Sequence, residues 1–158
     1  MTIAIGDRFP DVTIKTNGPD GPEDLNTGEF LAGRRVALFA VPGAFTPGCS
    51  NTHMPGFVVN ADKIHAKGVD AIACLAVNDA FVMGAWQRDQ NAEAITMLAD
   101  GSAELTRALG LEKDASAAGM GTRCQRFAMI VDDGVVKYLG IDTKSVEQSS
   151  AEALLSQL

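Results

Sequence analysis

Residues 36–53 read VALFAVPGAFTPGCSNTH and join an apolar run to a polar turn. The run VALFAV at 36–41 predicts a strand buried on both faces, because strands in the middle of a parallel sheet carry continuous apolar residues. The turn that follows ends at Cys49, where a helix is predicted to begin. A helix N-terminus has unpaired N–H groups and a partial positive charge, and both favour a thiolate. Because the thiolate is the reactive form of cysteine, this segment predicts redox chemistry at Cys49.

The rest of the chain alternates predicted strands and helices around this segment. Strands are predicted at 11–15, 35–41, 69–77, 94–98, 127–131 and 135–139, with Asp-Asp-Gly at 132–134 as a hairpin turn and a turn-rich loop at 16–22. The first helix is predicted to begin at Cys49, to kink at Pro55-Gly56 and to end at Gly68. A second is predicted after an N-cap at Asn78 or Asp79, and a short third helix is predicted to begin at Ser102. A last helix is predicted from Ser149 and Glu152, which have the spacing of a capping box. This order indicates an α/β fold, a mixed central sheet with helices on both faces, in which Cys49 lies at the carboxyl end of a strand.

The composition is typical of one globular domain spanning 1–158. Hydrophobic residues make up 46% and charged residues 21%, which argues against a disordered chain. The net charge of −7 disfavours nucleic acid and anionic membranes as partners, and no apolar run has the length of a membrane span. The N-terminus lacks a basic region followed by an apolar stretch, and three scattered cysteines do not form a secreted disulfide framework. We therefore expect a cytoplasmic protein.

Several segments resemble a known family of thiol peroxidases. They are PGAFTPGCS at 42–50, HMPGF at 53–57, AVNDAFVM at 76–83, MLADGS at 97–102 and RFAMIVDDG at 126–134. Together they resemble the type II, or peroxiredoxin 5, subfamily of the peroxiredoxins over nearly the whole chain. The resemblance implies a thioredoxin-like fold, a homodimer, and reduction of hydrogen peroxide and alkyl hydroperoxides by a cysteine without a metal or an organic cofactor. It also implies recycling by a thiol reductant, either glutathione with glutaredoxin or thioredoxin.

The chemistry expected at Cys49 needs a hydroxyl, an apolar wall and N–H donors around the sulfur. Thr46 lies three residues before the sulfur and can direct its hydroxyl at the thiolate and the peroxide, or cap the helix. Pro42 stiffens the turn and would shelter the thiolate from water. The N–H groups of Gly48 and Cys49 would hold the substrate and stabilise developing negative charge. Attack of the thiolate on the O–O bond would then leave a sulfenic acid on Cys49.

A guanidinium beside the thiolate would stabilise it and bind the peroxide by hydrogen bonds. The resemblance matches the family's active-site arginine to Arg126, and Arg123 is a second candidate.

Two further cysteines bear on how the sulfenic acid is reduced. Cys74 lies 25 residues after Cys49 in an apolar strand, a spacing that resembles plant-type members of the subfamily, in which this cysteine can resolve the sulfenate. The alternative is a buried core thiol, with direct reduction of Cys49 by an external thiol. A disulfide requires Cα atoms within about 7 Å, so a mid-strand cysteine would first need local unfolding. Cys124 lies outside the family pattern, and its neighbouring arginines could activate it.

Several other conspicuous residues favour structural roles. His53 follows the reactive thiol by one turn, but no second pair at ligand spacing exists in the sequence, so we expect packing or hydrogen bonding and no metal. His65 is expected at the surface, whereas Phe81 and Trp86 are expected in the core. Residues 119–121, Gly-Met-Gly, are expected in a subunit contact near the active site, as the resemblance to dimeric relatives implies.

Two other functions are compatible with a reactive thiol. In a regulatory or binding protein, oxidation of Cys49 or Cys74 would change partner contacts, and turnover would be incidental. A thiol–disulfide oxidoreductase normally carries Cys-x-x-Cys, and Thr46 occupies the first of these positions here, which speaks against that activity.

Overall fold

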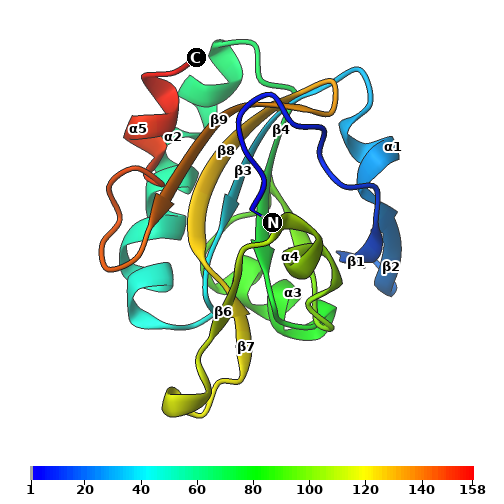
Figure 1. Cartoon of the computed structure of the whole chain (residues 1–158), viewed down its shortest axis with the longest axis vertical. Helices are drawn as coiled ribbons and strands as arrows, with labels where there is room; N and C mark the ends of the chain where they lie inside the picture. The colour runs from blue at the N-terminus through cyan, green and yellow to red at the C-terminus, as the bar shows by residue number, and fades with distance from the viewer. Residues whose placement is uncertain (1) are drawn as a thin grey trace.

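Seven strands form one mixed sheet in the computed structural model, which describes residues 2–158 (Figure 1). The strands lie in the order β2-β1-β5-β4-β3-β8-β9, with β3, β4 and β5 parallel and the flanking pairs antiparallel. They are β1 Thr13–Gly18, β2 Gly21–Asn26, β3 Arg35–Ala40, β4 Ala71–Ala76, β5 Ile95–Ala99, β8 Arg126–Asp132 and β9 Val135–Asp142. A separate hairpin pairs β6 Glu112–Asp114 with β7 Thr122–Cys124 and projects from the body of the molecule (Figure 1).

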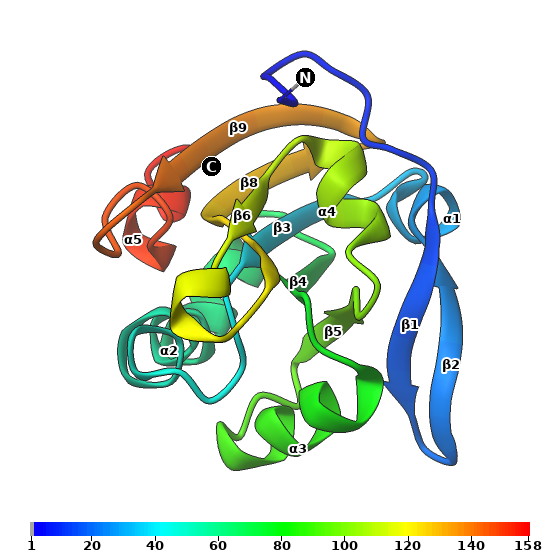
Figure 2. The same ribbon diagram turned by 60° about the horizontal axis from the view of Figure 1, so that its bottom comes forward.

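Helices cover both faces of the large sheet, as predicted (Figure 2). They are α1 Thr27–Leu31, α2 Met54–Ala66, α3 Ala80–Asp89, α4 Glu104–Leu109 and α5 Ala151–Leu155, with a π-helical turn η1 Cys49–His53 and a 3-10 turn η2 Ser116–Ala118. One face is covered by α2, α3 and α5, which bury Phe57, Trp86 and Leu154 in a shared core. The other is covered by α1 and α4, which bury Leu31 and Leu105 in a second core.

Strand β3 is the central element of the fold and leads directly to Cys49. All its residues from Val36 to Ala40 are buried. Successive side chains of a strand point to opposite faces, so Phe39 enters the core beneath α2 and α3 while Leu38 enters the other core. Burial on both faces explains the continuous apolar run of this strand. The loop carrying Cys49 therefore starts at the carboxyl end of β3, as predicted.

Three local signals are confirmed at the ends of elements. Asp79 caps α3 by accepting a hydrogen bond from the backbone N–H of Val82 at 2.8 Å. Gly68 follows α2 with φ of +91°, a conformation that glycine adopts without strain. The turn between β8 and β9 has φ of +47° at Asp133 and +80° at Gly134, as expected for an Asp-Gly hairpin.

Five features of the secondary structure differ from the prediction. Most of the loop predicted at 16–22 belongs to the β1–β2 hairpin, and neither β2 nor α1 was expected. The N-cap of α5 is Ser150 instead of Ser149, whose hydroxyl donates to Asp142. Helix α4 starts at Glu104, after Ser102, and the carboxylate of Asp100 accepts from its first N–H groups.

The side chain of Phe81 does not lie in the core. It is 72% exposed at the start of α3, whereas Trp86 on the same helix is fully buried as predicted. The buried face of α3 is formed instead by Ala80, Met83 and Trp86.

Candidate active site

Cys49 begins a π-helical turn at the carboxyl end of β3 and is completely buried. The turn runs to His53 and passes into α2, so the helix is irregular before Pro55, which lies in the first turn of α2. The irregularity predicted at Pro55-Gly56 thus falls one turn earlier, around the thiol. Single π-helical turns of this kind are frequent at functional sites because they redirect side chains within a helix.

Arg126 contacts the sulfur of Cys49. Its Nη2 donates to Sγ at 3.3 Å. The contact exists because β8 pairs with β3, and the register Ala40 to Phe127 places the start of β8 next to the loop after β3. A guanidinium donor at this distance stabilises negative charge on sulfur by a charge-assisted hydrogen bond. Of the two arginine candidates, Arg126 is the one that the structure brings to the thiol.

His53 holds this guanidinium in place, which confirms the hydrogen bonding predicted for this residue and adds Arg126 as a partner that the sequence did not identify. Its Nδ1 lies 2.8 Å from Nη1 of Arg126, and its Nε2 lies 2.7 Å from the backbone oxygen of Ser149. The ring is therefore neutral, with Nε2 donating and Nδ1 accepting. Burial and then the positive charge of Arg126 lower the pKa of His53 from 6.5 to about 3. The spacing of four residues from Cys49 was the only sequence signal for this role.

The loop from Pro42 to Gly48 forms the other wall of the site. Thr46 is half-buried, and its hydroxyl donates to the backbone oxygen of Gly43 at 2.8 Å. The hydroxyl oxygen therefore keeps its acceptor capacity for a substrate O–H. Pro42 is half-buried, and Gly48 lies against Arg126, since a Cβ at position 48 would be 3.2 Å from Nη2. Of the predicted loop residues, the structure thus brings Gly48 against Arg126 and places Pro42 with Arg126 in the wall of one cavity.

Arg123 has a different task. Its Nε donates to the backbone oxygen of Met120 at 2.9 Å and its Nη1 to that of Val77 at 3.1 Å. These bonds tie the β6–β7 hairpin to the segment after β4. Arg123 therefore holds the hairpin in position, and its hydrogen bonds within residues 2–158 do not include one to the sulfur of Cys49.

The other two cysteines are buried and inert in this conformation. Cys74 lies in β4 between Phe39 of β3 and Met97 of β5, and it shares a core with Cys49. Burial raises the pKa of the Cys74 thiol well above its usual range, and the neighbouring Cys49 raises it further. Burial also raises the pKa of Cys124 to about 12, so its neighbouring arginines do not activate it.

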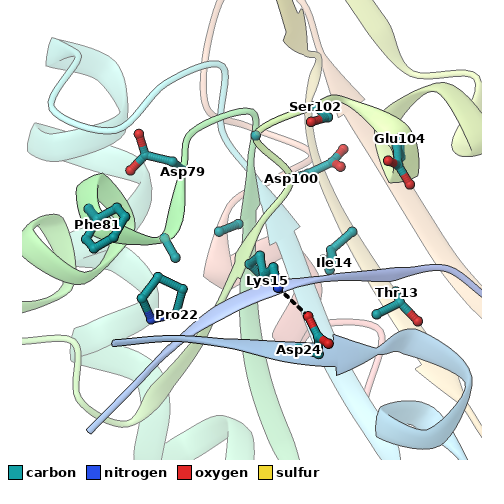
Figure 3. Close-up of a pocket in the computed structure, with 13 residues that line it drawn as sticks. Thr13, Ile14, Lys15, Pro22, Asp24, Asp79, Phe81, Asp100, Ser102 and Glu104 are labelled. Atoms are coloured by element: carbon teal, nitrogen blue, oxygen red, sulfur yellow. Dashed lines mark hydrogen bonds and ion pairs between the residues drawn. The ribbon is translucent and has the colours of Figure 1, made fainter. Parts of the chain in front are cut away.

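Two cavities bear on the choice of site. The larger, with a volume of about 400 Å³, lies between the β1–β2 hairpin and the start of α3 (Figure 3). We call it the acidic cavity, because Asp24, Asp79, Asp100 and Glu104 line it. It contains neither cysteine nor arginine. A second cavity of about 270 Å³, the lysine cavity, is lined by Pro42, Glu112, Lys113, Arg126, Asp142 and Lys144 among others, and it adjoins the thiol site.

Neither a metal centre nor a membrane helix was found in the part of the chain that the structure describes. Within residues 2–158, no three histidines, cysteines or acidic residues come together as metal ligands. The helices in the same range are too short or too polar to span a bilayer.

Comparison with known proteins identifies the family. The Redoxin family model matches residues 4–155. Peroxiredoxin-2E-2, chloroplastic, of Oryza sativa subsp. japonica is 50% identical over 164 residues, covering 99% of this chain and 73% of the rice protein. Peroxiredoxin-2E, chloroplastic, of Arabidopsis thaliana is 43% identical, and the match covers 99% of this chain and 70% of the Arabidopsis protein. The structure of reduced Prx3 in complex with hydrogen peroxide from Vibrio vulnificus is 52% identical, with a TM-score of 0.94 over 98% of both chains.

These relatives also correct one expectation. The N-terminal sequence led us to expect a cytoplasmic protein, but the rice and Arabidopsis relatives are both named chloroplastic, and this finding contradicts the prediction. The expectation of a thiol-dependent peroxidase agrees with the relatives, which are named peroxiredoxins. With half its residues identical to a named peroxiredoxin over nearly its full length, the chain belongs to the peroxiredoxins, the thiol-dependent peroxidases of the thioredoxin-like superfamily.

Proposed function

We propose that Cys49 is the peroxidatic cysteine of this enzyme. The observation that carries the proposal is the bond of 3.3 Å from Arg126 Nη2 to Cys49 Sγ, at the carboxyl end of the central strand. A guanidinium in this position donates a charge-assisted hydrogen bond to the sulfur, and it can also bind a peroxide oxygen as the substrate approaches.

The proposed reaction starts with attack of the Cys49 thiolate on one peroxide oxygen. An S–O bond forms while the O–O bond breaks, and the other oxygen leaves as hydroxide or alkoxide and takes up a proton. Arg126 stabilises the leaving oxygen, together with the N–H groups of Gly48 and Cys49. Thr46 accepts a hydrogen bond from the peroxide O–H, because its own proton is directed at Gly43. Pro42 contributes the shape of the wall.

We further propose that an external thiol reduces the sulfenic acid, either glutathione with glutaredoxin or thioredoxin. Support comes from Cys74, which is fully buried in the middle of β4 with ladder partners on both sides. A Cys49–Cys74 disulfide would require β4 to separate from the sheet, because in the intact sheet burial raises the pKa of Cys74 and keeps it a weak nucleophile.

We also propose that the chain acts as a single domain over 1–158 and assembles as a homodimer. The family match over residues 4–155 supports one domain. Two exposed aromatic side chains support a contact surface, namely Phe45 in the active-site loop at 52% exposure and Phe81 at the start of α3 at 72%. Exposed aromatics near a site are typical of interfaces. The turn at 119–121 lies on the β6–β7 hairpin, and its Met120 reaches the active-site loop, since a Cβ at Gly43 would be 3.3 Å from Met120 Cε.

Replacing Cys49 with serine tests the central assignment. Cys49→Ser should abolish consumption of hydrogen peroxide in the presence of thiol, because a hydroxyl is a far weaker nucleophile than a thiolate. The matched control is Cys124→Ala, which removes an equally buried thiol from the other core and should keep wild-type turnover. Peroxide consumption by Cys49→Ser at the wild-type rate would overturn the proposal.

A further inference from the structure

The lysine cavity holds two cations without carboxylate partners. It lies between β6, the end of β9 and the wall formed by Pro42 and Arg126. Lys113 of β6 and Lys144 after β9 are both exposed. Among the described residues the only ion pair within 4 Å is Lys15 with Asp24, on the opposite side of the sheet order. Both lysines are therefore free to bind an anion.

One of the two carboxylates in the cavity wall, that of Asp142, is held by hydrogen bonds from its own loop. Asp142 is buried, and its oxygens accept from the backbone N–H groups of Glu147, Gln148 and Ser149 and from the hydroxyl of Ser149. Burial favours the neutral acid, but the bonds from Ser149 and the adjacent backbone outweigh it and lower the pKa of Asp142. Its charge thus stabilises the 143–150 loop. Glu112 is the one acidic residue of the cavity wall that is exposed.

The cavity is locally cationic in an acidic protein. Its wall carries Lys113, Lys144 and Arg126 against Glu112 and Asp142, whereas the whole chain has a net charge of −7. The acidic cavity has the opposite character, because its cation, Lys15, is paired with Asp24 while Asp79, Asp100 and Glu104 add negative charge (Figure 3). An anionic small molecule is therefore directed to the lysine cavity and repelled from the other.

We infer that the lysine cavity binds the carboxylate of a small thiol, of the glutathione class, which reduces the oxidised Cys49. The inference rests on the function proposed above, since it concerns the second half of that reaction. The volume of about 270 Å³ is slightly below the roughly 300 Å³ at which pockets for whole small-molecule ligands begin, so the cavity would hold the carboxylate end of the thiol and leave its sulfur outside, toward Cys49. Pro42 and Arg126 are shared by the cavity and the thiol site, so a thiol bound there lies next to the reacting sulfur.

The reduction proceeds by two thiol steps. The sulfur of the bound thiol attacks the sulfenic acid of Cys49, an S–S bond forms, the S–O bond breaks, and hydroxide leaves with a proton as water. A second molecule of the same thiol then attacks the mixed disulfide, releasing the Cys49 thiolate and the disulfide of the small thiol. Cys49 is fully buried, so the first π-helical turn must open locally for the attack.

The test compares two thiols on a pair of double variants. Lys113→Gln/Lys144→Gln removes both cations of the cavity, and Lys63→Gln/Lys137→Gln removes two exposed lysines elsewhere on the surface. Each protein is oxidised with one equivalent of hydrogen peroxide and then mixed with glutathione, which carries carboxylates, or 2-mercaptoethanol, which carries none. The fluorescence of Trp86 reports on the site, because Trp86 Nε1 donates to Ser50 Oγ at 2.9 Å and Ser50 follows Cys49 in the chain.

The first double variant should reduce the rate constant for glutathione roughly threefold to tenfold, in line with the loss of two exposed charge pairs. Rates with 2-mercaptoethanol and with hydrogen peroxide should stay at the wild-type value, as should all rates of the control variant. An unchanged glutathione rate, an equal loss with both thiols, or the same loss in the control would overturn the inference.

Two further outcomes are informative. One shows whether the bound carboxylate belongs to the peroxide instead of the thiol, and the other shows whether the proposed function itself fails. A slower oxidation by a fatty-acid hydroperoxide, with reduction by glutathione unchanged, would assign the cavity to the peroxide and refute the thiol assignment. Failure of the wild-type protein to be oxidised at Cys49 by hydrogen peroxide would refute the proposed function itself, and this inference with it.

Discussion

Replacing His53 with glutamine should remove much of the acid sensitivity of the fold. In the structure His53 is neutral, accepting a hydrogen bond from Arg126 and donating one to the backbone oxygen of Ser149. A second proton would turn Nδ1 into a donor facing a guanidinium, so protonation of the ring opposes folding. Glutamine offers one acceptor and donors for the same partners, but it does not titrate.

The expected size follows from the difference between the pKa of about 3 in the folded chain and 6.5 for the free side chain. Because the folded-state pKa is the lower one, the stabilisation is fully present above pH 6.5 and is lost as the pH falls toward 3. Each pH unit in this window costs about 1.4 kcal/mol, so the free energy of unfolding should fall by about 2.5 kcal/mol between about pH 7.5 and about pH 4.5. This contribution should be absent from His53→Gln.

Urea unfolding under reducing conditions, followed by the fluorescence of Trp86 at a series of pH values, measures the difference. The comparison variant is His65→Gln, which removes the other histidine of the chain, so the difference between the two variants isolates the contribution of His53. Asp142 titrates below this window, since its hydrogen bonds outweigh burial and lower its pKa, and it is the same in all three proteins. Parallel stability curves for the wild type and His53→Gln would refute the reasoning.

Two other predictions concern the reaction itself. Arg126→Ala should slow oxidation of Cys49 by hydrogen peroxide about 10- to 100-fold in stopped-flow fluorescence, since a hydrogen bond to a charged group contributes about 1.5–3 kcal/mol. Arg126→Lys should recover only part of the rate, because one ammonium cannot replace two nitrogens that bond His53 and Cys49 separately; a wild-type rate in Arg126→Ala would move the role elsewhere. Mass spectrometry after one equivalent of peroxide should show a sulfenate or an external-thiol adduct on Cys49. A Cys49–Cys74 link that forms as fast as peroxide is consumed would contradict the external route.

The centre of the fold could be predicted because its signals are local. The apolar run of β3 needs burial on both faces, whatever its partners are. The capping carboxylate of Asp79 and the Asp-Gly turn after β8 each satisfy the backbone of their own segment. Strand β2 was missed because its sequence, GPEDLN, is poor in strand-forming residues, and its conformation depends on pairing with β1.

The support around the thiol depends on contacts between distant segments, and sequence patterns do not report these. The bond from His53 to the backbone of Ser149 joins residues 96 positions apart. The cap of α5 moved by one residue for a similar reason, because Asp142 of β9 takes the hydroxyl of Ser149 and leaves Ser150 to cap. Arg126 was identified through a resemblance to a family, and only the pairing of β3 with β8 explains its contact.

Two of the cysteines, Cys49 and Cys74, are equally buried but lie in elements that open by different motions, so their labelling rates can report on those motions. Cys74 can react with an alkylating reagent only when β4 parts from β3 and β5, so its labelling rate measures how often the whole sheet opens. Cys49 lies in a single π-helical turn and is reached by a much smaller fluctuation. Once each rate is divided by the reactivity of the exposed thiol, the logarithm of their ratio gives the difference in free energy between opening of the π-helical turn and separation of β4 from the sheet.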